Sequence, residues 1–120
     1  MKESDKLVSI RVRNWRVVLK MVKQVIIWKL QDKCFGPNLG AIKESIKTRL
    51  EDLNGKIPGL ENIDVRTECL SSSNGDVAAM ALFESEEAFK NYQKHELRLA
   101  ATKDVVVPFV DSATHVEFEV

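Results

Sequence analysis

Hydrophobic and polar residues alternate with a period of two along several stretches of the chain, a pattern that is typical of β-strands. The clearest stretch is Val22–Leu30, which is rich in β-branched and aromatic residues and contains no glycine or proline. One of its faces is apolar except for Gln24. The side chain of Gln24 either points into a cavity or bonds to backbone near the strand end, and we favour the backbone bond.

Two later stretches predict a hairpin, because strands at Glu61–Leu70 and Asp76–Phe83 flank the small polar turn Ser71–Gly75. Both faces of the second strand are apolar, with Ala79 and Ala81 on one of them. A sheet with helices on one side needs another cover for its second apolar face. The most common cover is a second copy of the same sheet, which predicts a homodimer.

Two stretches with helical periodicity separate the strands. The first begins after Asn38, a residue suited to cap a helix, and the second is capped by Ser85. A further helical stretch runs from Leu97 to Val107, and Thr114–Val120 alternates as a closing strand. The order is βαββαβ, the ferredoxin-like α+β arrangement with an antiparallel sheet.

The length of 120 residues suits a single domain, and we place it at residues 21–120 after an extension at residues 1–20. The extension is an extra strand or hairpin, or an upstream segment. It holds six basic and two acidic side chains, so the rest of the chain is mildly acidic. We therefore do not expect nucleic-acid binding on the domain; an alternative is nucleic-acid or partner binding through a basic arm formed by Arg11, Arg13, Trp15 and Arg16.

Cys34 and Cys69 are far apart, which favours reduced thiols and a cytoplasmic location. No apolar run has the length of a membrane-spanning helix, and no signal peptide is recognisable. The two cysteines and the two histidines, His95 and His115, lack the short spacings of a metal site. We expect no metal and no cofactor.

One polar cluster has the composition of a functional site. Tyr92, His95 and Arg98 follow one another at three-residue spacing, which makes side chains neighbours on a helix. Tyr92 and His95 are the candidate catalytic residues, with the imidazole of His95 as a general base. The structural interpretation, which we favour, has Tyr92 packed in the core and His95 capping a helix C-terminus.

Five segments together resemble the stress-responsive α/β-barrel (Dabb) family over residues 21–120: MVKQVIIWKL at Met21–Leu30, IPGL at Ile57–Leu60, FESEEAFKNYQKH at Phe83–His95, VPFV at Val107–Val110 and VEFEV at Val116–Val120. The resemblance implies a ferredoxin-like subunit whose sheet pairs with that of a second subunit to close a dimeric barrel. Most members have no established biochemical role.

One branch of the family contains polyketide cyclases that use a tyrosine and a histidine late in this motif. Tyr92 matches the tyrosine, but the position of the catalytic histidine holds Arg98, and a histidine of the first strand is replaced by Gln24. Arginine does not deprotonate in proteins, so it cannot act as the base. The chain therefore departs from the cyclase pattern.

We expect a homodimer with a cleft between sheet and helices that takes a small apolar or aromatic anion. The expected lining residues are Gln24, Trp28, Ala79, Ala81, Tyr92, His95 and Arg98. The alternative is a cofactor-independent enzyme, cyclase-like or isomerase- or monooxygenase-like, that uses His95.

Overall fold

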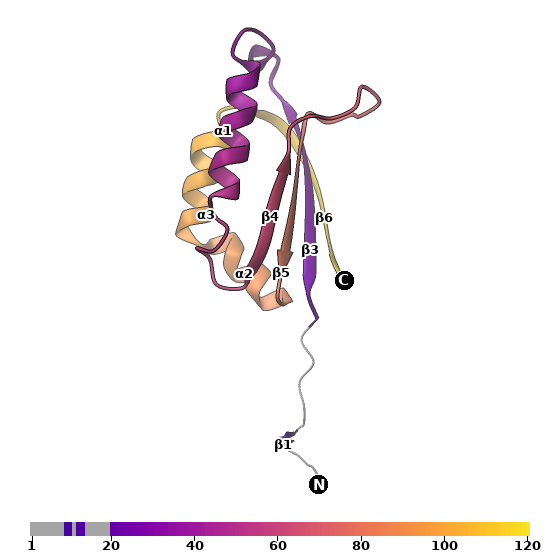
Figure 1. Cartoon of the computed structure of the whole chain (residues 1–120), viewed down its shortest axis with the longest axis vertical. Coiled ribbons are helices and arrows are strands. Elements are labelled where there is room, and N and C mark those ends of the chain that lie inside the picture. Colours follow the sequence, from indigo (N-terminus) through magenta and orange to yellow (C-terminus); the bar gives the residue numbers. More distant parts are fainter. Residues whose placement is uncertain (1–8, 11, 14–19) are drawn as a thin grey trace.

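The computed structural model describes residues 9–10, 12–13 and 20–120, and its centre is a four-stranded antiparallel sheet (Figure 1). The strands lie in the order β4-β5-β3-β6. Their bounds are β3 Val22–Leu30, β4 Leu60–Arg66, β5 Val77–Phe83 and β6 Val110–Glu119. This order and the alternation of strands with helices confirm the predicted ferredoxin-like βαββαβ fold.

The helices cover one face of the sheet (Figure 1). α1 spans Leu39–Glu51, α2 spans Glu86–Lys94 and α3 spans Glu96–Ala101. A short 3₁₀ turn, η1 at Asp32–Cys34, follows β3, and a π-helical turn, η2 at Thr102–Val106, extends α3 toward β6.

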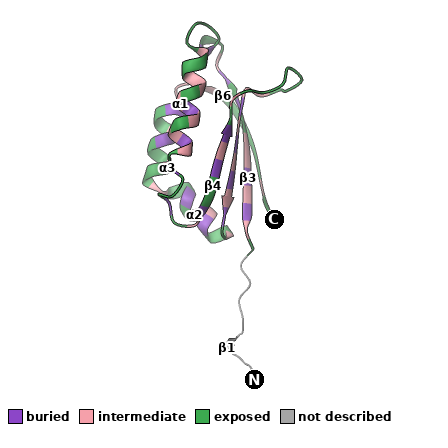
Figure 2. Cartoon of the chain, viewed as in Figure 1, coloured by how far each residue is buried: buried purple, intermediate pink, exposed green. Residues whose placement is uncertain are grey.

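The core lies between the helices and the sheet, where buried residues face one another (Figure 2). The largest side chains that are fully buried there belong to Phe83, Ile46, Val65, Val77 and Cys34. The predicted alternation in β3 and β5 is correct, because every second residue of each strand is turned toward the helices. The sequence pattern therefore sets the face that each strand presents to the core.

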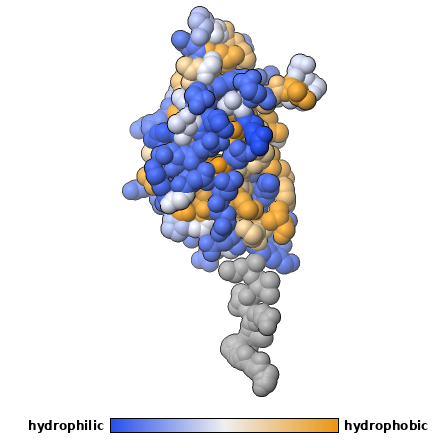
Figure 3. Space-filling model, in the orientation of Figure 1, coloured by the Kyte–Doolittle hydropathy of each residue, from blue (hydrophilic) through white to orange (hydrophobic). Residues whose placement is uncertain are grey.

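The opposite face of the sheet has no helix over it. Val25 of β3 lies between Met80 of β5 and Val116 of β6 in the strand register. Exposed apolar side chains on this face include those of Ile27, Val116 and Phe118, which are 44%, 54% and 45% exposed. Figure 3 shows polar side chains over the helices and apolar side chains gathered along the side of the molecule that carries the sheet.

β4 and β5 pair as antiparallel neighbours, as the predicted hairpin requires, but β4 ends before the predicted strand end at Leu70. β4 ends at Arg66, and residues 67–76 form a loop that closes on β3 through Asp76. The backbone N–H of Asp76 donates to the carbonyl of Trp28 at 2.8 Å, and its Oδ2 accepts from the N–H of Leu30 at 2.9 Å. The loop also contains a tight turn near the predicted place, in which the N–H of Ser73 donates to the carbonyl of Leu70 at 2.9 Å. Gly75 is needed here for close approach, since a Cβ would lie 2.2 Å from Cγ2 of Ile27.

Two helix starts were predicted from capping residues, with different outcomes. The hydroxyl of Ser85 accepts from the N–H of Ala88 at 3.1 Å, so the predicted cap of α2 is correct. The side chain of Asn38 makes no capping bond, although its backbone carbonyl accepts from Ile42 at 2.9 Å. Asn38 has φ −97° and ψ 4°, outside the extended conformation of a typical N-cap.

The N-terminal extension contributes two short strands, β1 (Ser9–Ile10) and β2 (Val12–Arg13). Of the predicted basic arm, Arg11, Trp15 and Arg16 lie outside the described residues, and the side chain of Arg13 is not described either.

Candidate functional site

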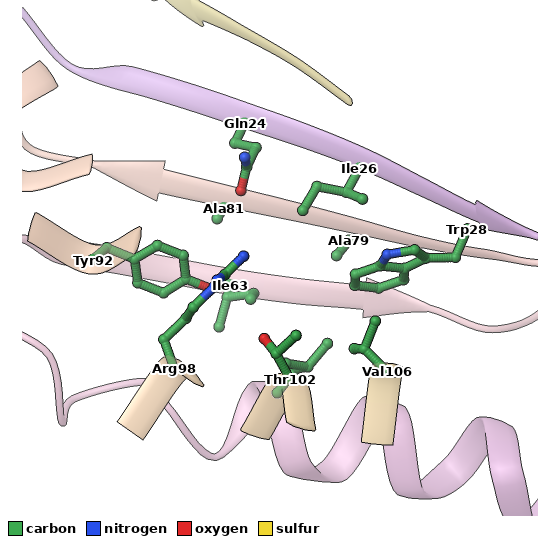
Figure 4. A pocket seen from close by; sticks show the side chains of 11 residues that line it. Gln24, Ile26, Trp28, Ile63, Ala79, Ala81, Tyr92, Arg98, Thr102 and Val106 are labelled. Atoms are coloured by element: carbon green, nitrogen blue, oxygen red, sulfur yellow. The ribbon is translucent and has the colours of Figure 1, made fainter. Parts of the chain in front are cut away.

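A small cavity lies between the face of the sheet that carries Gln24 and the helical segment formed by α3 and η2 (Figure 4). β3, β4 and β5 supply the sheet wall, and the helices supply the opposite wall. The residues that line it are Gln24, Ile26, Trp28, Leu50, Ile63, Ala79, Ala81, Tyr92, Arg98, Thr102 and Val106.

The cavity exists because two small residues of β5 face the helices. Ala79 is paired with Ile26 and Ala81 with Gln24 in the antiparallel register, so each alanine lies beside a larger side chain of β3. The methyl groups of the alanines leave space that a larger side chain would fill. The space open to the centre of a water molecule is about 20 Å³, enough for roughly one water. A larger occupant therefore requires side-chain movement.

Tyr92 and Arg98 reach the cavity from two different helices. Tyr92 is 5% exposed, and its ring packs against Phe83 with centroids 4.9 Å apart. Cζ of Arg98, on α3, lies 5.8 Å from the centroid of the Tyr92 ring, a distance suited to a cation–π contact. Among residues 20–120 no carboxylate forms a salt bridge with Arg98. The cavity thus holds a guanidinium without a carboxylate partner in that part of the chain.

The environment of Tyr92 changes its acidity. Burial raises the pKa of the Tyr92 phenol above its ordinary value of 10.0, because the low dielectric disfavours the charged phenolate. The nearby charge of Arg98 opposes this rise. Tyr92 is therefore a neutral hydroxyl at physiological pH, able to donate a hydrogen bond within the cavity.

His95 is not among the residues that line the cavity. It is the residue between α2 and α3, with an extended backbone (φ −66°, ψ 135°) that interrupts the helix. Its backbone N–H donates to the carbonyl of Tyr92, and its Nδ1 accepts from the N–H of Leu97 at 3.1 Å. His95 thus ends α2, as the structural interpretation predicted, and also caps α3.

Gln24 lines the cavity, which is the alternative that we did not favour. It is 5% exposed, and its Nε2 donates to Oε2 of Glu117 at 2.8 Å instead of to backbone. The same Oε2 lies 2.6 Å from Nδ1 of His115. Sequence analysis missed Glu117 and His115 as partners of the site, although their alternation in β6 already placed both on one face.

The pKa of the Glu117 carboxyl is lowered, mainly by the hydrogen bond from Gln24 and also by His115, while partial burial opposes the change. Glu117 is therefore ionised at neutral pH, and a carboxylate can only accept hydrogen bonds.

Six of the seven expected lining residues, all but His95, meet at this cavity. Within the part of the chain that the structure describes, no cluster of three or more histidine, cysteine or acidic side chains is arranged to hold a metal ion. Over the same residues, no helix has the length and apolar character needed to cross a membrane. Cys34 is buried and Cys69 is exposed, and both are free thiols.

A profile of the stress responsive A/B barrel domain (Dabb) family matches residues 22–120, so the chain belongs to this family. A comparison with curated protein sequences gives no match.

Solved structures share the fold. A dimeric protein of unknown function from Bacteroides fragilis is 25% identical with a TM-score of 0.76, covering 83% of this chain and 96% of its own. A dimeric ferredoxin-like protein of unknown function from Thermobifida fusca is 24% identical with a TM-score of 0.73, covering 89% and 97%. SnoaB, a cofactor-independent oxygenase from Streptomyces nogalater, is 16% identical with a TM-score of 0.62, covering 82% and 91%.

Proposed function

We propose that this Dabb domain binds a small apolar or aromatic anion in the cavity between sheet and helices. The observation that carries the proposal is Arg98, whose guanidinium lies over Tyr92 and has no carboxylate partner among residues 20–120. A cation that is partly shielded from water attracts a counter-ion more strongly than one in bulk water. Trp28 and the two alanines supply apolar contact for the rest of the ligand.

Entry of such a ligand requires the cavity to open. Arg98 is long and partly exposed, so its side chain can swing outward and then close on the anion. The carboxylate of the ligand accepts a charge-assisted hydrogen bond from the guanidinium of Arg98. The apolar part of the ligand then fills the opened cavity and contacts its apolar lining residues.

Trp28 fluorescence tests the proposal. The chain has two tryptophans, so the Trp15→Phe variant makes Trp28 the only one. We expect benzoate to change its emission in a saturable way, and benzyl alcohol, which has no charge, to bind at least about tenfold more weakly. Arg98→Met keeps the length of the side chain without the charge and should abolish the preference for benzoate. Equal binding of both compounds, or a benzoate preference that survives in Arg98→Met, would contradict the proposal.

Catalysis by His95 is less well supported. Its Nδ1 already accepts from Leu97, and its ring is not part of the cavity wall, so it is not placed to take a proton from a molecule bound there. The likeness to SnoaB extends to the fold alone. A turnover of any small aromatic substrate that is lost in His95→Asn, a variant that keeps a capping side chain, would favour the enzyme instead.

We also propose that the chain forms a homodimer through the open face of the sheet. This face carries exposed apolar side chains that include Ile27 and Phe118, and it borders a groove of about 360 Å³ beneath the loop at residues 72–75. Exposed apolar patches of this kind mark protein interfaces. The similar proteins from Bacteroides fragilis and Thermobifida fusca are described as dimeric.

Light scattering measures the mass of the particle in solution and so tests the dimer. Phe118→Glu places a charge on the open face, on the edge strand β6, and should halve the mass at micromolar concentration. The matched control is Leu99→Glu, because Leu99 is 49% exposed but lies on α3, across the molecule from the open face. A dimer that is lost in Leu99→Glu and kept in Phe118→Glu would move the interface to the helices.

A further inference from the structure

The amide group of Gln24 has a fixed orientation because Glu117 holds one end of it. The two residues are directly paired in the register of β3 and β6, and Nε2 of Gln24 donates to the carboxylate at 2.8 Å. Glu117 is ionised at neutral pH and offers only acceptors, so the NH₂ end of the amide must face it. The carbonyl end must then face away from β6.

Figure 4 shows the consequence for the cavity: Oε1 of Gln24 points from the sheet toward the side where Tyr92 and Arg98 lie. Among residues 20–120 the side chain of Gln24 forms its hydrogen bond through Nε2, and no protein donor reaches Oε1. Gln24 is 5% exposed, and a buried amide oxygen that lacks a donor costs free energy comparable to a lost hydrogen bond. An occupant of the cavity that carries a donor would satisfy it.

The two walls therefore differ in chemical character. The helix wall offers the guanidinium of Arg98 and the hydroxyls of Tyr92 and Thr102, and these donors suit an anion. The sheet wall offers the indole N–H of Trp28 and the carbonyl acceptor of Gln24, and the acceptor suits an O–H or N–H group. A plain aromatic acid would satisfy the first wall and leave the second unsatisfied.

We infer that the ligand is a hydroxylated acid, an aromatic or compact apolar anion with a hydroxyl donor on a second position, and that Glu117 sets this preference by orienting Gln24. The inference rests on the proposed function, because it takes the anion at Arg98 as given. Glu117 acts here as a specificity-determining residue that positions another side chain and does not itself line the cavity.

Matched ligand sets test the inference. In the Trp15→Phe protein, the ortho, meta and para isomers of hydroxybenzoate are titrated against the three methoxybenzoates, in which the oxygen can accept but not donate. We expect the best hydroxybenzoate to bind about fivefold or more tightly than its methoxy counterpart. In Glu117→Gln the amide of Gln24 is free to turn, and the ratio should fall to about one or reverse.

The matched control is Glu119→Gln. Glu119 lies on the same face of β6 as Glu117 and is paired with Val22. The substitution removes the same charge, but the carboxylate of Glu119 contacts Lys20 at 3.8 Å and not Gln24. A ligand-free readout accompanies the titrations: the side-chain amide resonances of Gln24 in a ¹⁵N spectrum should shift in Glu117→Gln and stay in place in Glu119→Gln. This readout distinguishes loss of the amide contact from a general loss of charge.

The outcomes separate the inference from the proposed function. If benzoates bind through Arg98 but hydroxy and methoxy isomers bind equally, the inference is wrong and the proposed function stands. If the amide resonances of Gln24 are the same in Glu117→Gln as in the parent, Glu117 does not orient the amide and the inference is again wrong. If no benzoate binds, the proposed function is wrong, and the inferred class of ligand, which rests on it, is wrong as well.

Discussion

The guanidinium carbon of Arg98 lies 5.8 Å from the centre of the Tyr92 ring, although the two residues belong to different helices. The contact joins a permanent cation to the only tyrosine of the chain at the wall of the cavity. Because the chain turns at His95 between them, the position of Arg98 over the ring depends on the break between α2 and α3.

The first prediction concerns the acidity of Tyr92. Arg98→Met removes the charge that holds down the pKa of this phenol, so we expect the pKa to rise further. Tyrosinate absorbance during an alkaline titration of the folded protein reports Tyr92 alone, since no other tyrosine is present. The control is Arg66→Met, which removes an exposed arginine paired with Asp64 and should leave the titration unchanged. A midpoint that falls or stays constant in Arg98→Met would show that the contact has no electrostatic effect.

The second prediction is a pH dependence of stability. Burial raises the pKa of Tyr92 in the folded chain above 10.0, so the folded state prefers the protonated phenol. Its contribution to the free energy of unfolding is fully present below pH 10.0 and is lost as the pH rises through the folded pKa. Tyr92→Phe has no phenol to ionise, so its stability does not fall for this reason at high pH. All other groups titrate alike in both proteins. In urea unfolding, the stability of the parent relative to Tyr92→Phe should therefore decline above this pH, and a constant difference would refute the assignment.

The third prediction concerns His95, whose ring accepts from the N–H of Leu97. His95→Ala removes the acceptor that caps α3 and should lower the free energy of unfolding by about 1 kcal/mol. His95→Asn restores a capping acceptor and should recover most of that loss. Chemical denaturation of the two variants measures both effects. If His95→Ala leaves the free energy of unfolding unchanged, the capping bond does not contribute to stability.

The fourth prediction compares two glycines with positive φ, Gly55 at 79° and Gly59 at 84°. Gly55→Ala meets open space and should cost only the strain of a left-handed residue, about 1 kcal/mol. Gly59→Ala meets the same strain and also places a Cβ 2.5 Å from Cβ of Ala88, so it should cost clearly more. Thermal or urea unfolding compares them. Equal losses would mean that the approach of β4 to α2 relaxes freely.

The sequence predicted the fold well because the signals were local and repeated. The alternation in β3 and β5 placed Trp28, Ala79 and Ala81 on the face that meets the helices, and the cap at Ser85 marked the start of α2. These features depend on residues close together in the chain. The same holds for the assignment to the Dabb family, which a profile match over residues 22–120 confirms.

Features that depend on distant residues were not predictable in this way. The bond between Gln24 and Glu117 spans 93 positions and follows from the strand register, which no local pattern specifies. The bond between Asp76 and Leu30 likewise joins residues 46 positions apart, and the turn residues Asn74 and Gly75 gave no sign of it.

The spacing of Tyr92, His95 and Arg98 misled for a different reason. Side chains three residues apart are neighbours only on an unbroken helix. The extended backbone of His95 interrupts the helix between Tyr92 and Arg98. Tyr92 and Arg98 meet at the cavity, whereas His95 is used to join the helices. The role of these residues in ligand binding stays a prediction.

The most direct test of an anion site at Arg98 is a crystal structure of the protein soaked with para-bromobenzoate, with anomalous data collected at the bromine edge. We predict that the carboxylate binds Arg98 and that the bromine peak lies in the cavity beside Trp28 and Ala79, with the Arg98 side chain displaced from its position over Tyr92. A bromine peak confined to the outer surface or to the open face of the sheet, with Arg98 still over Tyr92, would contradict the account.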